Sequence, residues 1–419
     1  MKFLRHMDGS VMRKLANLFL ILFIASAVTG IFHVLLEHYE IYPLATRIHR
    51  TLWGACLITG FLVYIGLGFN RHLPKRVLIP LFLWLFWSLV SYWPLDYFTA
   101  GWGRLIAYVA QLLFGAMVLK INFLLNNKGL LLVPEQFNGP AFSFRNLAVF
   151  SFISLIVIPA SLLLVLFSAV GGILEKSTGG FVQLRPDGLY MKEKVYHLEG
   201  KDIRLAGMIH LGQESYYADL FASIPVERTL ILAEGVTDEA GLMRHEFSYG
   251  NIADNLGLST QEQFHFAGRW ISLSDLAQPY REQYDGPHVL AADIDLQQFD
   301  PRSIEVLNAI ARHLLNAESL IKGYLEFNRW AEENVTVDTN RVLMYDLIDK
   351  RNQFVIDLLP QALERYDVVV IPWGALHMKG IEAAVRAADF YLHDTYLRRS
   401  ISFFDLPYSR IMRQLRSAE

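Results

Sequence analysis

The stretch DVVVIPWGALHMKG, residues 367–380, carries the clearest structural signal in the chain. Its first half is a short run of β-branched residues, which favours a buried β-strand. The run stops at Gly374, and His377 follows three residues later. The same Gly-X-X-His spacing ends another apolar run, IRLAGMIH, where Gly207 precedes His210. Two strands that end in the same way predict that both histidines lie at one edge of a sheet.

A third apolar run, RTLILAE, ends at Glu234, and long helical patterns separate these runs. Strands that alternate with helices predict an α/β domain with a central, mostly parallel sheet. The carboxyl ends of parallel strands meet at one edge, where open α/β sheets bind their ligands. We therefore expect His210, Glu234 and His377 to share a site. A single histidine after a strand often only caps the strand or fills the core, so the hypothesis rests on the three residues together.

The first part of the chain is too apolar for an ordinary soluble protein. The 419 residues are 53% hydrophobic, with a mean hydropathy of +0.28. A bilayer core about 30 Å thick needs about 20 helical residues. Five stretches without Asp, Glu, Lys or Arg are candidate spans: residues 15–36, 51–70, 77–95, 105–119 and 146–174. The sequence predicts an N-terminal transmembrane bundle of about five helices, residues 1–175, and an α/β domain, residues 176–419.

Lysine and arginine in short loops usually stay on the cytoplasmic side of a membrane. Such residues cluster in the N-terminal segment, after the second span and after residues 105–119: Lys2, Arg5, Arg13, Lys14, Arg71, Lys75, Arg76, Lys120, Lys128 and Arg145. With five spans, this pattern predicts an inner- or plasma-membrane protein with a cytoplasmic N-terminus and an extracytoplasmic C-terminal domain. If residues 105–119 do not span, the domain lies on the other side. No small-residue cleavage site follows the first span, so we expect no cleaved signal peptide.

Charge, cysteine content and motifs exclude several classes. The net charge is −3 and no dense basic stretch lies outside the membrane flanks, which argues against a nucleic-acid partner. The single cysteine, Cys56, excludes a disulfide within the chain. The sequence has no HEXXH, GXSXG, Gly-rich phosphate loop or CXXC, which disfavours zincin, α/β-hydrolase, P-loop and thioredoxin chemistry.

Two neutral imidazoles and one carboxylate form a usual ligand set for an open divalent metal site. We therefore expect His210, Glu234 and His377 to hold Mn²⁺, Co²⁺ or Zn²⁺. Glu234 either completes this ligand set or takes the proton from the attacking water. Gly207 and Gly374, three residues before each histidine, let the strand turn sharply or let a substrate backbone approach the sheet edge.

A second pair of carboxylates follows the strand-like run VLAADID. Asp293 and Asp295 are two residues apart, so both could point the same way and bind a metal or a polar substrate group. A turn or a helix cap before PRSIEVL is the favoured interpretation.

The order of the motifs resembles the TraB/PrgY family and its Tiki relatives. The matching positions are GMIH, a strand ending in Glu234, a helix with the pair Arg351 and Asn352, and GALHMKG, which ends at Gly380. The resemblance covers most of residues 200–392. It implies a fold like that of the erythromycin esterase and ChaN-like group. It also implies a membrane-tethered, metal-dependent peptidase with the two histidines and the glutamate at its active site.

In this hydrolytic hypothesis, Arg351 stabilises the charge that develops on a carbonyl oxygen, and Asn352 orients a ligand or the substrate backbone. A lone arginine on a helix is more often solvated and paired with a neighbour, here Asp349 or Glu364. The expected function is a membrane-anchored, metal-dependent hydrolase, a peptidase acting on a peptide or protein substrate. Two alternatives stay open: a non-catalytic regulatory protein that binds a peptide, a metal or haem in the same pocket, and a cytoplasmic regulator.

Overall fold

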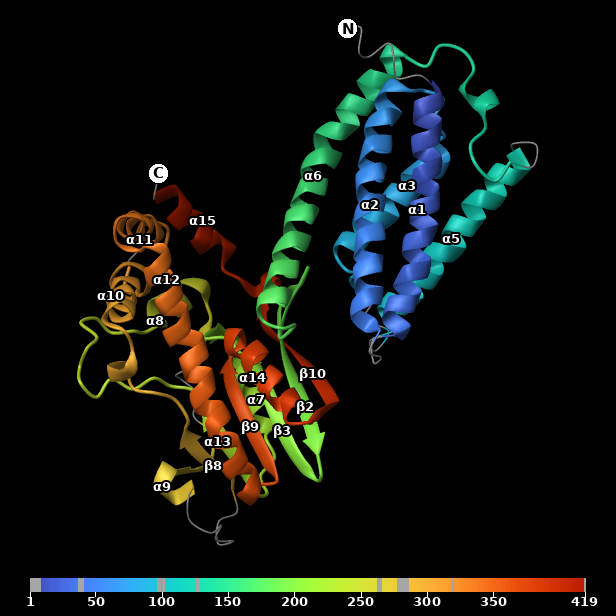
Figure 1. The fold of residues 1–419 in the computed structure, drawn as a ribbon. Coiled ribbons are helices and arrows are strands. Elements are labelled where there is room, and N and C mark those ends of the chain that lie inside the picture. Colours follow the sequence, from blue (N-terminus) through green and yellow to red (C-terminus); the bar gives the residue numbers. More distant parts are fainter. Residues whose placement is uncertain are drawn as a thin grey trace. The chain divides into compact units, whose positions relative to one another are not determined.

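The computed structural model describes residues 9–36, 41–95, 99, 102–125, 129–261, 266–276, 286–317 and 320–417. The chain divides into two compact units, Met1–Ala169 and Val170–Glu419. The first unit is helical, and the second is an α/β domain (Figure 1). The predicted combination of an apolar helical part and a following α/β domain is confirmed.

Four helices in the described residues are long and apolar enough to cross a membrane. They are α1 (Gly9–Leu35), α2 (Tyr42–Phe69), α5 (Gly103–Leu125) and α6 (Phe144–Ser177). A helix satisfies all of its backbone hydrogen bonds internally, which is what an apolar surrounding demands. Helix α5 covers residues 105–119, the shortest predicted span, and extends it at both ends.

The predicted span over residues 77–95 is wrong in its extent. Helix α3 (Lys75–Leu89) has only 15 residues. At 1.5 Å per residue it is about 22 Å long, shorter than a bilayer core of about 30 Å. Ser91 and Tyr92 have φ values of 53° and 59°, a left-handed backbone that a right-handed helix does not contain. The described chain therefore has four candidate spans, where the sequence predicts about five.

One buried polar side chain links helices within the first unit. Gln111 of α5 donates hydrogen bonds to the carbonyl oxygen of Phe23 (2.8 Å) and to the hydroxyl of Ser26 (3.0 Å), both on α1. Its own carbonyl accepts from the hydroxyl of Tyr92 at 3.1 Å. Because a buried polar group without a partner costs free energy, these bonds favour one arrangement of α1 and α5.

In the described part of the second unit, eight strands form one mixed sheet in the order β1-β2-β3-β9-β5-β8-β7, with β10 also paired to β2. The parallel part consists of β3 (Lys201–Met208), β9 (Val368–Gly374), β5 (Thr229–Ala233), β8 (His288–Ala291) and β7 (Arg269–Ile271). The antiparallel part consists of β1 (Val182–Arg185), β2 (Gly188–Leu198) and β10 (Tyr391–Ser402). The predicted mostly parallel sheet is confirmed.

Strand β9 lies between β3 and β5, so the three strands predicted to carry the site are direct neighbours. The residues of β9 from Val369 to Trp373 are all buried, as its β-branched sequence predicts. Helices α13 (Arg351–Arg365) and α14 (Ala375–Ala387) pack against β9, as Figure 1 shows. The core of the domain forms where these helices cover the sheet.

A run of further helices connects β8 to α13: α10 (Pro301–Ile310), α11 (Leu320–Asn334) and α12 (Val337–Met344). Two π-helical segments interrupt the run, η5 (Ala311–Leu315) and η6 (Tyr345–Lys350), and η6 leads directly into α13. Shorter helices are α7 (Glu214–Ala222), α8 (Gly250–Leu256) and α9 (Leu273–Leu276), and α15 (Tyr408–Ser417) follows β10.

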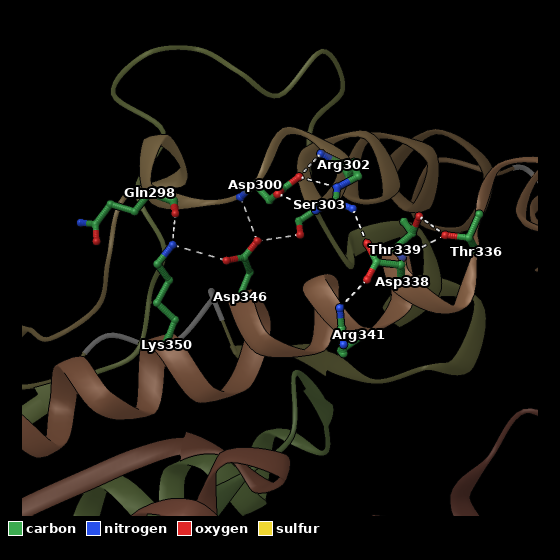
Figure 2. Close-up of polar contacts among 10 residues, drawn as sticks. All are labelled: Gln298, Asp300, Arg302, Ser303, Thr336, Asp338, Thr339, Arg341, Asp346 and Lys350. Carbon is green, nitrogen blue, oxygen red and sulfur yellow. Dashed lines mark hydrogen bonds and ion pairs between the residues drawn. The ribbon is translucent and has the colours of Figure 1, made fainter.

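A buried carboxylate fixes η6, and therefore the start of α13, against α10 (Figure 2). Asp346 of η6 accepts hydrogen bonds from the Asp300 N–H (2.8 Å) and from the hydroxyl of Ser303 (2.7 Å). Lys350, one turn further, donates to the carbonyl oxygen of Gln298 and lies 3.4 Å from the Asp346 carboxylate. The next residue in the chain is the first residue of α13.

We predict that Asp346→Ala lowers the free energy of unfolding by about 2–3 kcal/mol. The substitution leaves the Asp300 N–H and the buried Ser303 hydroxyl without their acceptor. The matched control is Asp338→Ala, which removes a carboxylate bound to the exposed Arg302 and Arg341 and should change the free energy by less than about 1 kcal/mol. Denaturant unfolding of the full chain in detergent measures both, and equal effects would contradict the structural role of Asp346.

Candidate functional site

The candidate site lies at the carboxyl edge of the parallel strands. Glu234 follows β5 directly, Asp293 follows β8 by two residues, and β9 ends at Gly374. These strands are parallel neighbours, so their ends meet. The Glu234 carboxylate accepts a hydrogen bond from the Gly374 N–H at 2.5 Å, which joins the ends of β5 and β9. Only 6% of the Glu234 side chain and none of the Asp293 side chain is exposed.

Arg351, the first residue of α13, bridges the two carboxylates. Its Nη2 lies 2.8 Å from Oε1 of Glu234 and 2.7 Å from Oδ2 of Asp293. Its Nε adds a second bond to Asp293 at 3.0 Å, and the guanidinium lies over the ring of Trp373. Arg351 is therefore buried and paired across the sheet edge, and the alternative of a solvated arginine paired with Asp349 or Glu364 is wrong.

His377 belongs to a helix, whereas the sequence predicts it at the end of a strand. Strand β9 ends at Gly374 and α14 begins at Ala375, which places His377 in the first turn of α14. Its Nε2 lies 3.5 Å from Oε1 of Glu234 and 3.3 Å from Nη1 of Arg351. The side chain is almost fully buried and packs edge-on against the Trp373 ring.

Asn352 fixes the orientation and the tautomer of His377. Its Nδ2 donates to the backbone carbonyl of His377 (3.3 Å), which leaves its Oδ1 as the acceptor 2.8 Å from His377 Nδ1. An amide oxygen at this position requires a proton on Nδ1, so Nε2 carries the lone pair. The Nε2 lone pair therefore faces Glu234 and accepts a hydrogen bond from Nη1 of Arg351.

Burial and charge shift the pKa values of both groups. Burial alone would raise the pKa of Glu234, but Arg351, the two histidines and the hydrogen bond from the Gly374 N–H together outweigh burial and hold this pKa below its ordinary value. Burial lowers the pKa of His377 to about 4, with Glu234 opposing the shift and Arg351 adding to it. At neutral pH the site therefore contains an ionised Glu234 and a neutral His377 imidazole.

His210 lies beyond the end of β3 and is exposed, whereas the side chains of Glu234, Arg351 and His377 are buried. Its ring stacks on Tyr249 with centroids 4.9 Å apart and planes 7° from parallel. Its backbone carbonyl accepts a hydrogen bond from the Gln261 N–H. The charge of His210 contributes to the lowered pKa values of Glu234 and His377, so it lies within electrostatic reach of both.

The three glycines of the two motifs differ in how closely neighbouring atoms approach them. Each has an ordinary negative φ, so none is required for a left-handed turn. A Cβ on Gly207 would lie 3.1 Å from the Cβ of Phe181, because the segment before β1 passes close to β3. A Cβ on Gly380 would lie 2.5 Å from Nδ2 of Asn352. Gly380 therefore leaves room for the amide that orients His377, whereas Gly374 has only ordinary contacts.

For Asp293 and Asp295, the sequence favours a turn or a helix cap. This prediction is confirmed for Asp295 and wrong for Asp293. Asp295 caps η4 (Leu296–Gln298), where its side chain accepts from the Gln297 N–H. Asp293 instead accepts from the Gly235 N–H at 3.0 Å and from Arg351. The signal that favours Asp293 as a site residue is its position within two residues of the end of a buried strand, close to the place that Glu234 has after β5.

Two side chains at this sheet edge, Glu234 and His377, have the atoms and the spacing that a divalent cation requires of its ligands. Glu234 Oε1 and the unprotonated Nε2 of His377 lie 3.5 Å apart, and the Nδ1–H of His377 is held by a carbonyl oxygen, as is usual for metal-ligating histidines. Among the described residues, no three His, Cys, Asp or Glu side chains group closely enough to hold a metal ion. In this arrangement the guanidinium of Arg351 balances the carboxylates.

We predict that Gly380→Ala destabilises the domain by about 1–3 kcal/mol, because the new methyl group displaces the Asn352 amide. Alanine inside a helix otherwise stabilises by about 1 kcal/mol relative to glycine, so the sign of the change is diagnostic. The control Gly374→Ala meets neighbours at 3.5 Å or more and should change the stability by about 0.5 kcal/mol or less. Denaturant unfolding measures both, and a stabilised Gly380→Ala variant would refute the contact.

Comparison with known proteins adds no relative: no family model, curated protein or solved structure matches the chain. A functional assignment therefore depends on the chemistry of the residues at this sheet edge.

Proposed function

We propose that the second unit is a metal-dependent hydrolase that cleaves peptides, tethered to a membrane by the apolar helices. The observation that carries the proposal is the buried cluster of Glu234, His377, Arg351 and Asn352 at the carboxyl edge of the sheet. The order of these residues in the sequence resembles the TraB/PrgY family and its Tiki relatives. A fold of the erythromycin esterase and ChaN-like type is part of the same proposal.

Glu234 and His377 would hold the divalent ion, Mn²⁺, Co²⁺ or Zn²⁺, and His210 would be the third protein ligand. Such an ion polarises a carbonyl group and lowers the pKa of a bound water. The neutral state of His377 supports this role, because a protonated imidazole cannot bind a metal. Glu234, ionised at neutral pH, can serve either as a ligand or as the base that accepts a proton.

Asn352, Asp293 and Arg351 orient His377 and compensate the negative charge of Glu234. Asn352 keeps the Nε2 lone pair of His377 directed at Glu234. Asp293 holds the guanidinium of Arg351 through two bonds, so that its Nη1 stays beside His377. A positive group at this position would stabilise negative charge on a carbonyl oxygen of the substrate.

The proposal predicts metal-dependent cleavage of a mixed peptide library by the full chain in detergent. After treatment with a chelator, activity should return with Mn²⁺, Co²⁺ or Zn²⁺. His377→Ala should reduce cleavage to the background, and Asn352→Ala should reduce it by about 10–100-fold, the usual effect of losing the partner of a metal-binding histidine. The control His393→Ala changes an exposed histidine of β10 and should retain full activity.

Thermal unfolding of the same samples separates activity from folding, because an ion that binds only the folded state raises the melting temperature. If no metal produces cleavage and His377→Ala behaves as the wild type, the hydrolase proposal is refuted. A metal, haem or peptide that raises the melting temperature of the wild type alone, without turnover, would instead support the non-catalytic binding protein.

We also propose that the second unit is extracytoplasmic. One cationic loop precedes α3 and another follows α5. These two loops lie on the same side of the membrane only if α3, with the residues that follow it, crosses the membrane in addition to α5. With α1, α2, α5 and α6 alone, the second unit would lie on the side of the N-terminus. Protease added to intact cells should cut the second unit from outside, whereas protection in intact cells and cleavage after permeabilisation would show that it is cytoplasmic.

A further inference from the structure

Helix α15 (Tyr408–Ser417) and the segment just before it leave three large apolar side chains half exposed or more. Phe404, Tyr408 and Met412 are spaced four residues apart and are 73%, 54% and 50% exposed. Residues four apart on a helix share one side, so Tyr408 and Met412 form an apolar strip along α15, and Phe404 precedes it. We call these three residues the α15 strip.

The opposite side of α15 contacts the domain. Arg410 donates a hydrogen bond to the carbonyl oxygen of Asp254 in the last turn of α8 (Gly250–Leu256). A cation at the C-terminal end of a helix is favourable, because the carbonyl groups there carry partial negative charge. An ordinary surface helix buries its apolar side and exposes its charges, whereas α15 uses an arginine for the contact and turns Tyr408 and Met412 outward.

The sequence of α15, YSRIMRQLRS, has arginine at every third position, 410, 413 and 416, and contains no acidic residue. A short helix that combines apolar and aromatic residues with several arginines, at low overall hydrophobicity, is typical of helices that lie in the interface of a bilayer. The apolar side of such an interfacial helix enters the boundary between headgroups and acyl chains, and the cations of the helix bind lipid phosphates.

The connection to the apolar helices favours a membrane over other occupants. Helix α6 ends at Ser177 and β1 begins at Val182, so four residues, 178–181, separate a candidate span from the sheet of the domain. Such a short tether keeps the domain near the bilayer in which α6 is embedded, and the effective concentration of lipid at its surface is high. The α15 strip, with the exposed Arg413 on the same helix, then meets its complement in the same membrane.

We propose that α15 is an interfacial helix that docks the domain onto an anionic phospholipid surface through the α15 strip and Arg413. This proposal does not depend on the hydrolase activity. The one cysteine of the chain, Cys56, is buried, so a Cys56→Ser background, with its thermal unfolding matched to the wild type, permits single-site labelling.

The test places the full chain in nanodiscs of phosphatidylcholine with or without phosphatidylglycerol. A bimane fluorophore is attached at Met412→Cys or, as a control, at Val337→Cys, a position that is 91% exposed on α12. With phosphatidylglycerol, quenching by doxyl-labelled lipid should be at least roughly threefold greater at 412 than at 337, and iodide should quench 412 less. Arg413→Gln, or removal of the anionic lipid, should reduce the lipid quenching at 412.

Three results would overturn the proposal. Equal lipid quenching at 412 and 337 would show that the α15 strip stays in water. Strong lipid quenching that does not change without phosphatidylglycerol or with Arg413→Gln would remove the role of anionic lipid. Protection of 412 from both quenchers, together with a dimer in mass photometry, would show that a second copy of the chain covers the strip.

Discussion

The ion-pair bridge of Arg351 with Glu234 and Asp293 is the interaction on which the candidate site depends. Two carboxylates this deeply buried repel each other and lose their hydration, and a cation between them offsets both costs. Arg351 supplies that charge from the first position of a helix, and its guanidinium geometry lets it contact both carboxylates at once. The neutral state of His377 follows, because the same buried surroundings disfavour a second cation.

The rest of the domain can be understood as support for that bridge. The sheet order brings the ends of β5, β8 and β9 together, and Asp346 anchors the segment that leads into Arg351. Trp373 packs under both Arg351 and His377 and donates its ring N–H to the carbonyl oxygen of Leu232 on β5. Trp373, which contacts both site residues, is therefore hydrogen-bonded to β5, the strand that Glu234 follows.

Much of this arrangement could be predicted from the sequence, and the failures have physical reasons. The β-branched run before Gly374 and the polar residue after each strand indicate a parallel sheet with a site at its edge. Sequence alone does not specify which strands are neighbours, so Asp293, two residues beyond a strand, looks like another capping aspartate beside Asp295. His377 looks like the end of a strand because the helix begins only two residues before it, without a capping side chain.

The site is assembled from distant parts of the chain. Arg351 is separated from Asp293 by 58 residues and from Glu234 by 117. Contacts of such long range form slowly, because the loops between them must close before any bond is made. The bridge therefore requires the ends of β5 and β8 and the start of α13 to come together. A chain in which these three elements are still apart lacks the buried bridge, so the candidate site exists only in the folded domain.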